Sequence, residues 1–429
     1  MTTQDPKSIE RSGPVDATVT IPGSKSITNR ALVCAALAGS PSVIDGWLDA
    51  DDTRAMIAAL ETLGVAVGVG EHLSIGSDGP RPEVVSIDAR QSGTTSRFLL
   101  PVLALDGAPR RITGDEQLQV RPMGEAFEAL RALGARVSEE GVPGFLPAVV
   151  EGPLRGGEVE LAGDVSSQFV SGLLLAAPQM PGGLRVWIST ELISRPYVDM
   201  TVAVMRSFGA SVTVEDDRQW VVDALRYEGA EYTVEPDASA ASYAWGAAVV
   251  TGGAVTVPGL HRSSLQGDVA FVDVLEQMGA RVRWDDDAVT VAAGPTLRGV
   301  DVDLSQISDT VPTLAAIAAL ADGPTTIRGV GFIRNKETDR IAAPVTELRR
   351  CGVDASETDD GMVIVPGPVA PTVVETYDDH RMAMGFSLLG LVNDGIQIAG
   401  PDCVTKTFPG YWDLLDRLRV GSEPSARAV

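Results

Sequence analysis

Two kinds of apolar segment alternate along the chain. In the first kind, apolar residues recur three and four positions apart, as on one face of an amphipathic helix, and a glycine closes the pattern. A glycine at this place is typical of a helix whose end adopts the left-handed conformation. We therefore predict six amphipathic helices that end at a glycine, within residues 56–64, 126–134, 201–209, 271–279, 344–352 and, in a weaker copy, 414–421.

The second kind of segment begins as a short strand, continues through small polar residues and ends in a mostly apolar helix. Such helices are expected to be buried, because they have no broad polar face for solvent. The six segments are residues 19–38, 85–105, 159–177, 232–250, 302–320 and 373–391. Their polar starts are marked by Ser24, Gly93, Ser166, Ser239, Ser308 and Asp378.

Both patterns recur about every 70 residues, so the chain contains six copies of one unit. Each unit consists of a strand, a buried helix, a connecting stretch, an exposed helix and two strands. A chain of 429 residues exceeds one ordinary core, and six units suggest two domains of three. The sixth unit ends without room for its final strands, so we expect the N-terminal segment to complete its sheet. The sequence thus predicts an α/β fold with a discontinuous domain, residues 1–22 and 236–429, and a second domain, residues 23–235.

Composition restricts the class of partner. The net charge is -24, which argues against nucleic acid or an anionic membrane surface. Three scattered cysteines indicate free core thiols rather than a disulfide framework or a zinc site. The N-terminus has no apolar signal-peptide core, and the longest apolar runs are too short to cross a bilayer. We expect a cytoplasmic protein that acts on small molecules, as a monomer and without a metal or cofactor.

Charged residues interrupt the apolar pattern at a few helix starts. Lys25, Ser26 and Arg30 lie in the first turns of the first buried helix, where a cation opposes the helix dipole. The chain has only four lysines, at positions 7, 25, 336 and 406, against 30 arginines, which directs attention to those in such motifs. Helix starts supply free backbone N–H groups. Several of them converging between two domains would therefore form an anion pocket.

The second half of the chain adds carboxylates to such cations. Lys336, Glu337 and Arg340 are spaced to share one helical turn. Asp309 begins an apolar helix, and Arg381 begins another. Lys406 lies on a loop before the last helix. Taken alone, each of these features is also explained by helix capping or by a solvated charged face.

In this order, the motifs resemble those of the 5-enolpyruvylshikimate-3-phosphate synthases, in the enolpyruvyl transferase family. The resemblance covers about residues 15 to 420 and runs through GSKSITNR, SGTTSR, RPM, SSQF, RPYVDMT, DASAASY, DTVPTLAA, NKETDRI, DDHRMAM and KTFPGY. It implies an inverse α/β barrel-like fold of six units, with the active site in the cleft between the domains. It also implies transfer of the enolpyruvyl group of phosphoenolpyruvate to the 5-hydroxyl of shikimate 3-phosphate, through a tetrahedral intermediate and with release of phosphate.

The resemblance also implies roles for single residues. Asp309 would be the base on the 5-hydroxyl, Glu337 would exchange the proton of the methylene carbon, and Lys25 would assist. The residues implied for shikimate 3-phosphate are Lys25, Ser26, Arg30, Ser166, Ser167, Gln168, Ser194, Tyr197, Asp309 and Lys336. The residues implied for phosphoenolpyruvate are Lys25, Gly93, Arg121, Gln168, Arg340, Arg381 and Lys406. Arginine forks and lysine point charges suit these phosphates and the carboxylate.

The resemblance has one gap and leaves two alternatives. Phe332 stands where many members have an asparagine that contacts shikimate 3-phosphate, although Asn335 is near. Gly93 is present where glyphosate-sensitive members have glycine. The related transferase that acts on a UDP-amino sugar typically has a Lys-Asn pair and a loop cysteine, whereas this chain has Lys25-Ser26 and no cysteine between Cys34 and Cys351. A non-catalytic repeat protein that binds phosphorylated metabolites would have no use for carboxylates beside its cations.

Overall fold

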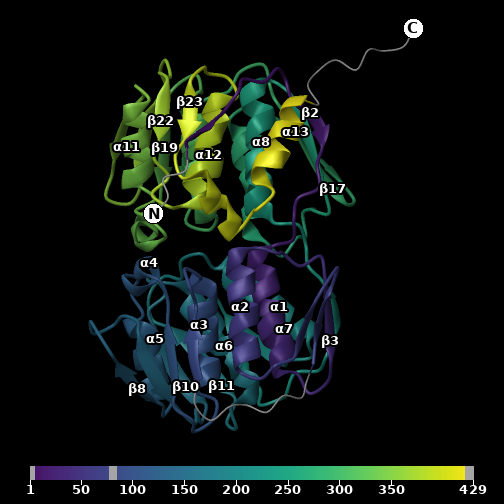
Figure 1. The fold of residues 1–429 in the computed structure, drawn as a ribbon, viewed down its shortest axis with the longest axis vertical. Coiled ribbons are helices and arrows are strands. Elements are labelled where there is room, and N and C mark those ends of the chain that lie inside the picture. Colours follow the sequence, from purple (N-terminus) through teal and green to yellow (C-terminus); the bar gives the residue numbers. More distant parts are fainter. Residues whose placement is uncertain (1–4, 77–84, 421–429) are drawn as a thin grey trace. The chain divides into compact units, whose positions relative to one another are not determined.

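The computed structural model describes residues 5–76 and 85–420 and divides into two compact units. Unit 1 is Met1–Pro22 with Pro236–Val429, and unit 2 is Gly23–Glu235. Within the described residues each unit contains three small sheets, and Figure 1 shows the helices packed beside them. The mixed α/β class predicted from the two alternating patterns is confirmed.

Unit 2 contains the sheets β14-β3-β5-β4, β6-β7-β9-β8 and β10-β11-β13-β12. Its strands are β3 (Ser42–Asp45), β4 (Val67–Val69), β5 (Leu73–Ile75), β6 (Val85–Asp88), β7 (Arg110–Thr113), β8 (Arg136–Glu139), β9 (Ala148–Glu151), β10 (Gly157–Leu161), β11 (Leu184–Ile188), β12 (Val212–Asp216), β13 (Gln219–Val222) and β14 (Glu231–Thr233). Its helices are α1 (Lys25–Leu37), α2 (Asp51–Thr62), α3 (Gly93–Leu103), α4 (Glu116–Gln119), α5 (Gly124–Ala132), α6 (Ser167–Ala176), the 3-10 helix η1 (Ala177–Gln179) and α7 (Pro196–Ser207).

Unit 1 contains the sheets β16-β17-β15-β2, β18-β19-β21-β20 and β1-β23-β22. Its strands are β1 (Lys7–Ser8), β2 (Asp16–Thr18), β15 (Ala254–Pro258), β16 (Arg281–Asp285), β17 (Ala288–Ala292), β18 (Asp301–Asp303), β19 (Thr325–Arg328), β20 (Asp354–Glu357), β21 (Met362–Val365), β22 (Thr372–Val374) and β23 (Ile396–Ile398). Its helices are α8 (Ala238–Thr251), η2 (Gly267–Ala270), α9 (Phe271–Gln277), η3 (Ser308–Thr310), α10 (Val311–Ala318), η4 (Gly331–Asn335), α11 (Ala342–Arg350), α12 (His380–Gly390), η5 (Pro401–Lys406) and α13 (Tyr411–Val420).

The repeated unit contains one strand more than the sequence pattern predicts. In four of the six copies the stretch after the buried helix forms a strand parallel to that copy's own leading strand, as β7 does beside β6 and β19 beside β18. In the first and fourth copies this strand, β3 or β15, is parallel to the leading strand of the other copy. The buried helix of those four copies is thus the crossover of a parallel β-α-β motif. In the first five copies two later strands add an antiparallel hairpin. These strands have only three to five residues, which is too short for a clear period-two pattern.

The two leading strands at the chain's crossovers pair in the unit that the chain is leaving. β2 precedes α1 of unit 2 but pairs with β15 of unit 1, and β14 precedes α8 of unit 1 but pairs with β3 of unit 2. β1 pairs with β23, so the N-terminal segment does complete the last sheet. The strand that leads into the first buried helix, β2, belongs instead to the sheet β16-β17-β15-β2 of the fourth repeat unit.

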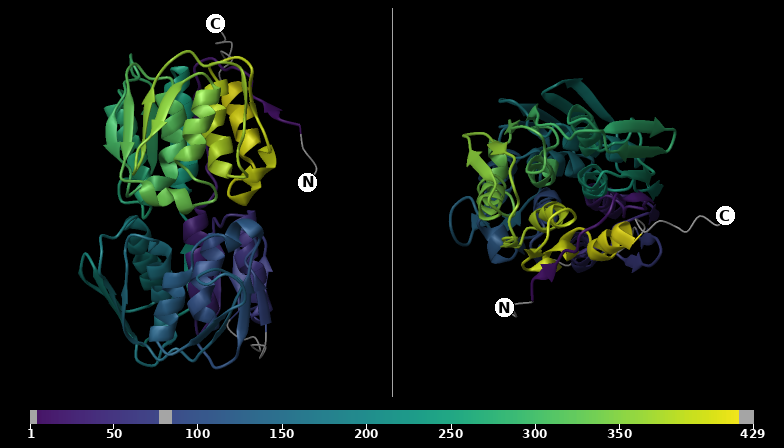
Figure 2. Two further views of the ribbon diagram at one scale, coloured as in Figure 1. Left: turned by 90° about the vertical axis from the view of Figure 1, so that its left-hand side faces the viewer. Right: turned by 90° about the horizontal axis from the view of Figure 1, so that it is seen from above.

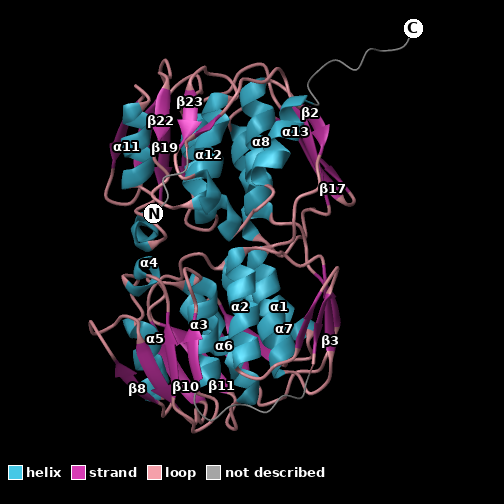
Figure 3. Ribbon diagram, in the orientation of Figure 1, coloured by secondary structure: helices cyan, strands magenta, loops and turns pink. Residues whose placement is uncertain are grey.

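The apolar helices form the interior of each unit, as predicted. The helices α1, α3 and α6 contact one another in unit 2, and α8, α10 and α12 do so in unit 1. Strands line the outside of each unit in the views of Figures 2 and 3. The amphipathic helices cover these interiors with their apolar faces, as α2 and α7 do against α1.

The glycines that close the amphipathic helices have the predicted conformation. Gly64, Gly134, Gly209, Gly279 and Gly352 have φ between 82° and 103°, in the left-handed region. Gly421 lies outside the described residues. All three cysteines are free: Cys34 and Cys351 are buried, and Cys403 is half-buried. In the described part of the chain, no helix combines the length and hydropathy that a membrane span requires.

Candidate functional site

The N-terminal halves of the three buried helices of unit 2 meet one another. Asn29 of α1 donates from Nδ2 to Thr94 Oγ1 of α3 at 2.8 Å. Arg97 of α3 donates from Nη1 to Gln168 Oε1 of α6 at 2.9 Å. Both bonds join residues within the first turn and a half of their helices. The positive ends of three helix dipoles therefore lie together, which favours an anion at this place.

Arg30 ties the segments of this helix-start region together. Its Nε donates to Thr201 Oγ1 at 2.7 Å, its Nη1 to the Ser26 carbonyl at 2.7 Å, and its Nη2 to the Tyr197 carbonyl at 3.0 Å. A longer bond of 3.4 Å joins Nη2 to Ser171 Oγ. These acceptors are all neutral. Complete burial lowers the pKa of Arg30 to about 10, which leaves the guanidinium charged at neutral pH.

Lys25 is the first residue of α1, and its ammonium lies 3.2 Å from Asp52 Oδ2. Asp52 is in the first turn of α2, where the helix dipole also favours its charge. The two side chains are 12% and 4% exposed, so this ion pair is shielded from solvent. Asp52 was not among the residues predicted from the sequence, although an acidic run at 49–52 precedes the amphipathic helix.

Gly93 and Arg121 lie against each other, as the resemblance to known transferases requires if both hold one ligand. A Cβ atom added at Gly93 would stand 2.8 Å from Arg121 Nη1, so the missing side chain makes room for the guanidinium. Arg121 is 5% exposed. Ser166 caps α6 by accepting from the Gln168 backbone N–H at 3.3 Å. The structure thus brings Gln168, Gly93 and their neighbours to the starts of α3 and α6.

Ser194 and Tyr197 lie just before and just inside α7 of the same unit. Ser194 is buried and has a φ of 52°, a conformation that is costly for a residue with a side chain. The Tyr197 carbonyl accepts from both Arg30 and Thr201, so the start of α7 is fixed to α1. Ser171 and Thr201 are further members of this network that the sequence analysis did not select.

In unit 1, two arginines and three carboxylates form one hydrogen-bonded network, which we call the α12 cluster: Asp309, Glu337, Arg340, Asp379 and Arg381. Arg340 Nη1 donates to Asp309 Oδ1 at 3.1 Å, and Arg381 Nη2 donates to Asp309 Oδ2 at 2.6 Å. Arg340 Nη2 also donates to Glu337 Oε2 at 2.8 Å. Asp309 is therefore held between two guanidinium groups, one of which also holds Glu337.

Asp379 fixes both arginines of the α12 cluster. Its carboxylate accepts from Arg340 Nε at 2.7 Å and from Arg340 Nη2 at 3.1 Å. As the N-cap of α12, it also accepts from the Arg381 backbone N–H at 2.9 Å. Burial alone would lower the pKa of Arg340, but Asp379, Glu337 and Asp309 together raise it above its ordinary value. Arg340 is thus a permanent cation, and the Asp379 carboxylate fixes the positions of both arginines.

The predicted helical turn that carries Lys336, Glu337 and Arg340 is wrong. Lys336 follows the 3-10 helix η4, and α11 begins only at Ala342. The reason is Asp339, whose Oδ1 accepts from the backbone N–H groups of Ile341 and Ala342, both at 2.9 Å. An aspartate that satisfies these amides favours a helix start after it and a loop before it. Glu337 and Arg340 still meet, but from a loop.

The remaining candidates of unit 1 are placed as follows. Lys406 is the last residue of η5 and is 4% exposed, and Lys336 is half-buried. Phe332 packs against the core of unit 1, and Asn335 is exposed. In the described part of the chain, no group of three or more His, Cys, Asp and Glu side chains is arranged to hold a metal ion.

The sequence analysis also missed Asp268, which lies in η2. Its carboxylate accepts from Ser239 Oγ in the first turn of α8. Burial raises the pKa of Asp268 to about 7, and the nearby charge of Asp309 contributes in the same direction. Asp268 is therefore a further carboxylate that interacts electrostatically with the α12 cluster and one that titrates near neutral pH.

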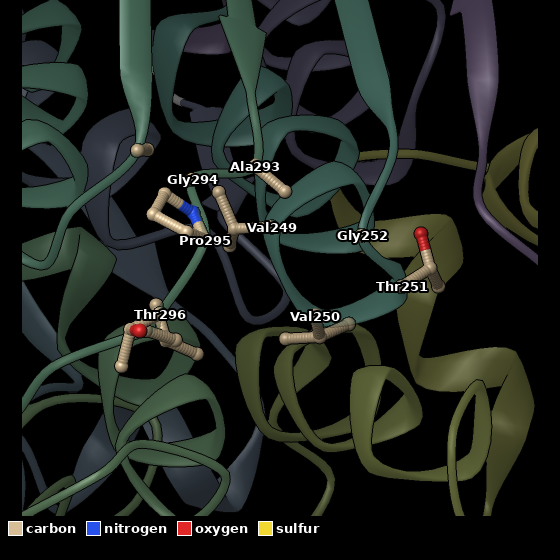
Figure 4. A pocket seen from close by; sticks show the side chains of 10 residues that line it. Val249, Val250, Thr251, Gly252, Ala293, Gly294, Pro295 and Thr296 are labelled. Carbon is tan, nitrogen blue, oxygen red and sulfur yellow. The ribbon is translucent and has the colours of Figure 1, made fainter.

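A cavity of about 250 Å³ lies elsewhere in unit 1, at the C-terminal end of α8 (Figure 4). It is lined by residues 249–252, 280 and 293–297, and none of these side chains is ionisable. The α12 cluster contacts the other half of α8 through Tyr243. This cavity does not suit an anionic substrate.

Comparisons with known proteins identify the family of the chain. Residues 9–415 match the family model described as EPSP synthase (3-phosphoshikimate 1-carboxyvinyltransferase). A 3-phosphoshikimate 1-carboxyvinyltransferase of Nostoc punctiforme is 44% identical over 406 residues, covering 93% of this chain and 95% of the relative. One of Methanosphaerula palustris is 42% identical over 416 residues, covering 95% and 98%.

A solved structure of EPSP synthase from Acinetobacter baumannii superposes with a TM-score of 0.80 at 27% identity, covering 96% of this chain and 98% of that one. The likeness therefore extends over both units and is not limited to a single motif. The family model, the relatives and the solved structure all name the same enzyme. The chain belongs to the EPSP synthase (3-phosphoshikimate 1-carboxyvinyltransferase) family.

Proposed function

We propose that the α12 cluster and the helix-start region of unit 2 together carry out the reaction of this family. The protein transfers the enolpyruvyl group of phosphoenolpyruvate to the 5-hydroxyl of shikimate 3-phosphate and releases phosphate, a step of aromatic amino acid biosynthesis. The observation that carries the assignment of residues is the position of Asp309 between Arg340 and Arg381, with Glu337 on the same guanidinium. A purely anion-binding protein would not place two carboxylates on its cations.

The proposed chemistry divides two proton transfers between Asp309 and Glu337. Asp309 accepts the proton of the 5-hydroxyl while the oxygen attacks the second carbon of phosphoenolpyruvate, and Glu337 donates a proton to the methylene carbon. The resulting tetrahedral intermediate then loses phosphate, whose leaving oxygen takes up the proton held by Asp309, and a proton of the methyl group returns to Glu337 as the enol ether forms. Arg340 and Arg381 stabilise the negative charge of the carboxylate and phosphate of phosphoenolpyruvate during both steps.

Unit 2 is proposed to hold the phosphate and ring of shikimate 3-phosphate. Lys25, Ser26 and Ser166 to Gln168 lie at helix starts, where backbone N–H groups and the helix dipoles favour the phosphate. Arg30 adds a buried positive charge and fixes Ser26 in position. Ser194, Tyr197 and Lys336 remain predicted contacts of the same substrate. Gly93, Arg121 and Lys406 remain predicted contacts of phosphoenolpyruvate.

We further propose that both groups of residues act on one pair of substrates, as expected if the domains close around it. Closure would exclude water from the tetrahedral intermediate. We also propose that the protein is a monomer and acts in the cytoplasm. Size-exclusion chromatography with light scattering tests the monomer, and protection of both units from hydrogen exchange by shikimate 3-phosphate with phosphoenolpyruvate tests the common site.

The decisive assay follows phosphate release from phosphoenolpyruvate with shikimate 3-phosphate as acceptor. Asp309→Asn and Glu337→Gln should each lower kcat by about 10²–10⁴-fold while the substrates still bind. Asp301→Asn, an exposed carboxylate paired with Arg328, is the matched control and should leave kcat unchanged. Release with a UDP-amino sugar and not with shikimate 3-phosphate would favour the related transferase. Binding without release would favour a non-catalytic protein.

A further inference from the structure

A buried carboxylate that the proposed mechanism does not use lies on α11. Glu347 has no exposed surface, and it occupies the fifth position before the closing glycine of its amphipathic helix. In the four other described copies that end in such a glycine, this position holds a buried apolar residue: Ala59, Ala129, Val204 and Val274. A carboxylate at a core position of the repeat costs stability unless its partners compensate, so its partners indicate its purpose.

Those partners hold the segment between β22 and α12. Glu347 Oε1 accepts from the Tyr377 hydroxyl at 2.7 Å, and Oε2 accepts from the Glu375 backbone N–H at 2.9 Å. Arg350 donates from Nη1 to the same Oε2 at 2.6 Å and from Nη2 to the Val373 carbonyl at 2.9 Å. One buried carboxylate and one arginine therefore clamp residues 373–377 onto α11.

The backbone is strained at two successive residues, the last residue of the clamped segment and the one after it. Tyr377 has a φ of 55° and Asp378 a φ of 57°, both in the left-handed region. This conformation is unfavourable for residues with a side chain and persists only where the surroundings enforce it. The next residue is Asp379, which caps α12 and accepts two hydrogen bonds from Arg340. The turn therefore sets the direction in which the Asp379 carboxylate points and the place of Arg381 in the first turn of α12.

We propose that Glu347 and Tyr377 are positioning residues that hold this turn and thereby place Asp379 and Arg381 for phosphoenolpyruvate. The inference rests on the proposed function, in which Arg340 and Arg381 bind that substrate. Neither Glu347 nor Tyr377 belongs to the α12 cluster itself; they act through the backbone of residues 375–379. The pKa of Tyr377 is raised to about 12 by burial of its hydroxyl and then by its bond to Glu347, so the hydroxyl remains a donor throughout the neutral range.

The test measures KM for each substrate and kcat in three variants. Glu347→Gln keeps the side-chain size but replaces a carboxylate oxygen, which accepts from the Glu375 N–H and from Arg350, by a neutral amide group. Tyr377→Phe removes only the hydrogen bond from the tyrosine hydroxyl to Glu347. We expect the KM for phosphoenolpyruvate to rise roughly tenfold in Glu347→Gln and less in Tyr377→Phe, with the KM for shikimate 3-phosphate within about twofold of the parent. Glu276→Gln, at an exposed position of α9, is the matched control and should change neither KM.

A rescue experiment separates positioning from general destabilisation. Asp378→Gly relieves the left-handed strain at one residue, because glycine adopts this conformation at little cost. Combined with Glu347→Gln, it should bring the KM for phosphoenolpyruvate back to within about threefold of the parent value. An unchanged KM in Glu347→Gln, an equal rise for both substrates, or a rise that Asp378→Gly does not reverse would overturn the inference. A parent enzyme that releases no phosphate would instead overturn the proposed function.

Discussion

Thr201→Val tests whether the buried network around Arg30 sets the affinity for shikimate 3-phosphate. Thr201 is completely buried on α7, and its Oγ1 accepts the Arg30 Nε–H at 2.7 Å. The hydroxyl lies 2.8 Å from both Ser171 Oγ and the Tyr197 carbonyl, so it links three segments of unit 2. Valine has nearly the same shape but offers no acceptor. The substitution therefore removes an interaction without opening a cavity.

The size of the expected change in KM follows from the free-energy cost of leaving the charged Arg30 donor without its acceptor inside a fully buried network. Such a loss costs about 1.5–3 kcal/mol. Part of this cost appears as lower stability of unit 2. The rest appears as displacement of the Arg30 guanidinium, which also bonds the Ser26 carbonyl. Since 1.4 kcal/mol corresponds to a factor of about ten, we expect the KM for shikimate 3-phosphate to rise roughly tenfold.

The assay is phosphate release at varied shikimate 3-phosphate, together with urea denaturation of the same preparations. Thr201→Ser keeps the hydroxyl and should recover most of the affinity, and Ser207→Ala removes an exposed hydroxyl of the same helix and should change nothing. The reasoning is refuted if Thr201→Val leaves the KM for shikimate 3-phosphate within twofold of the parent. It is also refuted if the serine variant is as impaired as the valine variant.

Three further outcomes are expected. Asp52→Asn removes the carboxylate that pairs with Lys25, so the KM for both substrates should rise about three- to tenfold, and Asp52→Glu should restore part of this loss in the same assay. Gly93→Ala places a Cβ atom 2.8 Å from Arg121 Nη1, so the KM for phosphoenolpyruvate should rise about tenfold while the KM for shikimate 3-phosphate stays constant. Burial raises the pKa of folded Asp268 to about 7, above its unfolded value, so its contribution to stability is largest at low pH and falls as the pH rises from about 4 to 7. Asp268→Asn should therefore gain urea stability relative to the parent between pH 5 and pH 8, and a constant difference over this range would contradict the assigned pKa.

The repeat could be predicted because it depends on local chemistry. A glycine after an apolar stripe ends the helix in every copy, because glycine adopts the left-handed conformation at little cost. The five closing glycines of the described residues, Gly64, Gly134, Gly209, Gly279 and Gly352, all have the expected left-handed φ. The two compact units change over between Pro22 and Gly23 and between Glu235 and Pro236, where a leading strand gives way to the polar start of a buried helix. The pairing of β2 with β15 and of β14 with β3 could not be predicted, because strand partners depend on contacts far apart in the sequence.

The candidate residues of the site were found through charge that interrupts an apolar helix, and this signal has a clear limit. It identifies Arg30 and Arg381, which are cations within buried helices. It misses Thr201 and Asp268, which are ordinary residues for their segments and gain importance only through the arginines and serines they contact. It also assigned Glu337 and Arg340 to a helical turn, since spacing alone does not show that Asp339 starts a new helix.

Arg30 of unit 2 differs from Arg340 and Arg381 of unit 1 in the groups that its guanidinium contacts, and this difference bears on what each can bind. In unit 2, Arg30 has only neutral acceptors and lies among helix starts, so this region keeps positive charge available for a phosphate. In unit 1, Arg340 and Arg381 are already bonded to Asp309, Glu337 and Asp379. In the proposed mechanism, a substrate anion in unit 1 shares its arginines with the carboxylates that exchange protons. Binding of the substrate and the ability of Asp309 and Glu337 to transfer protons are therefore coupled through the same guanidinium groups.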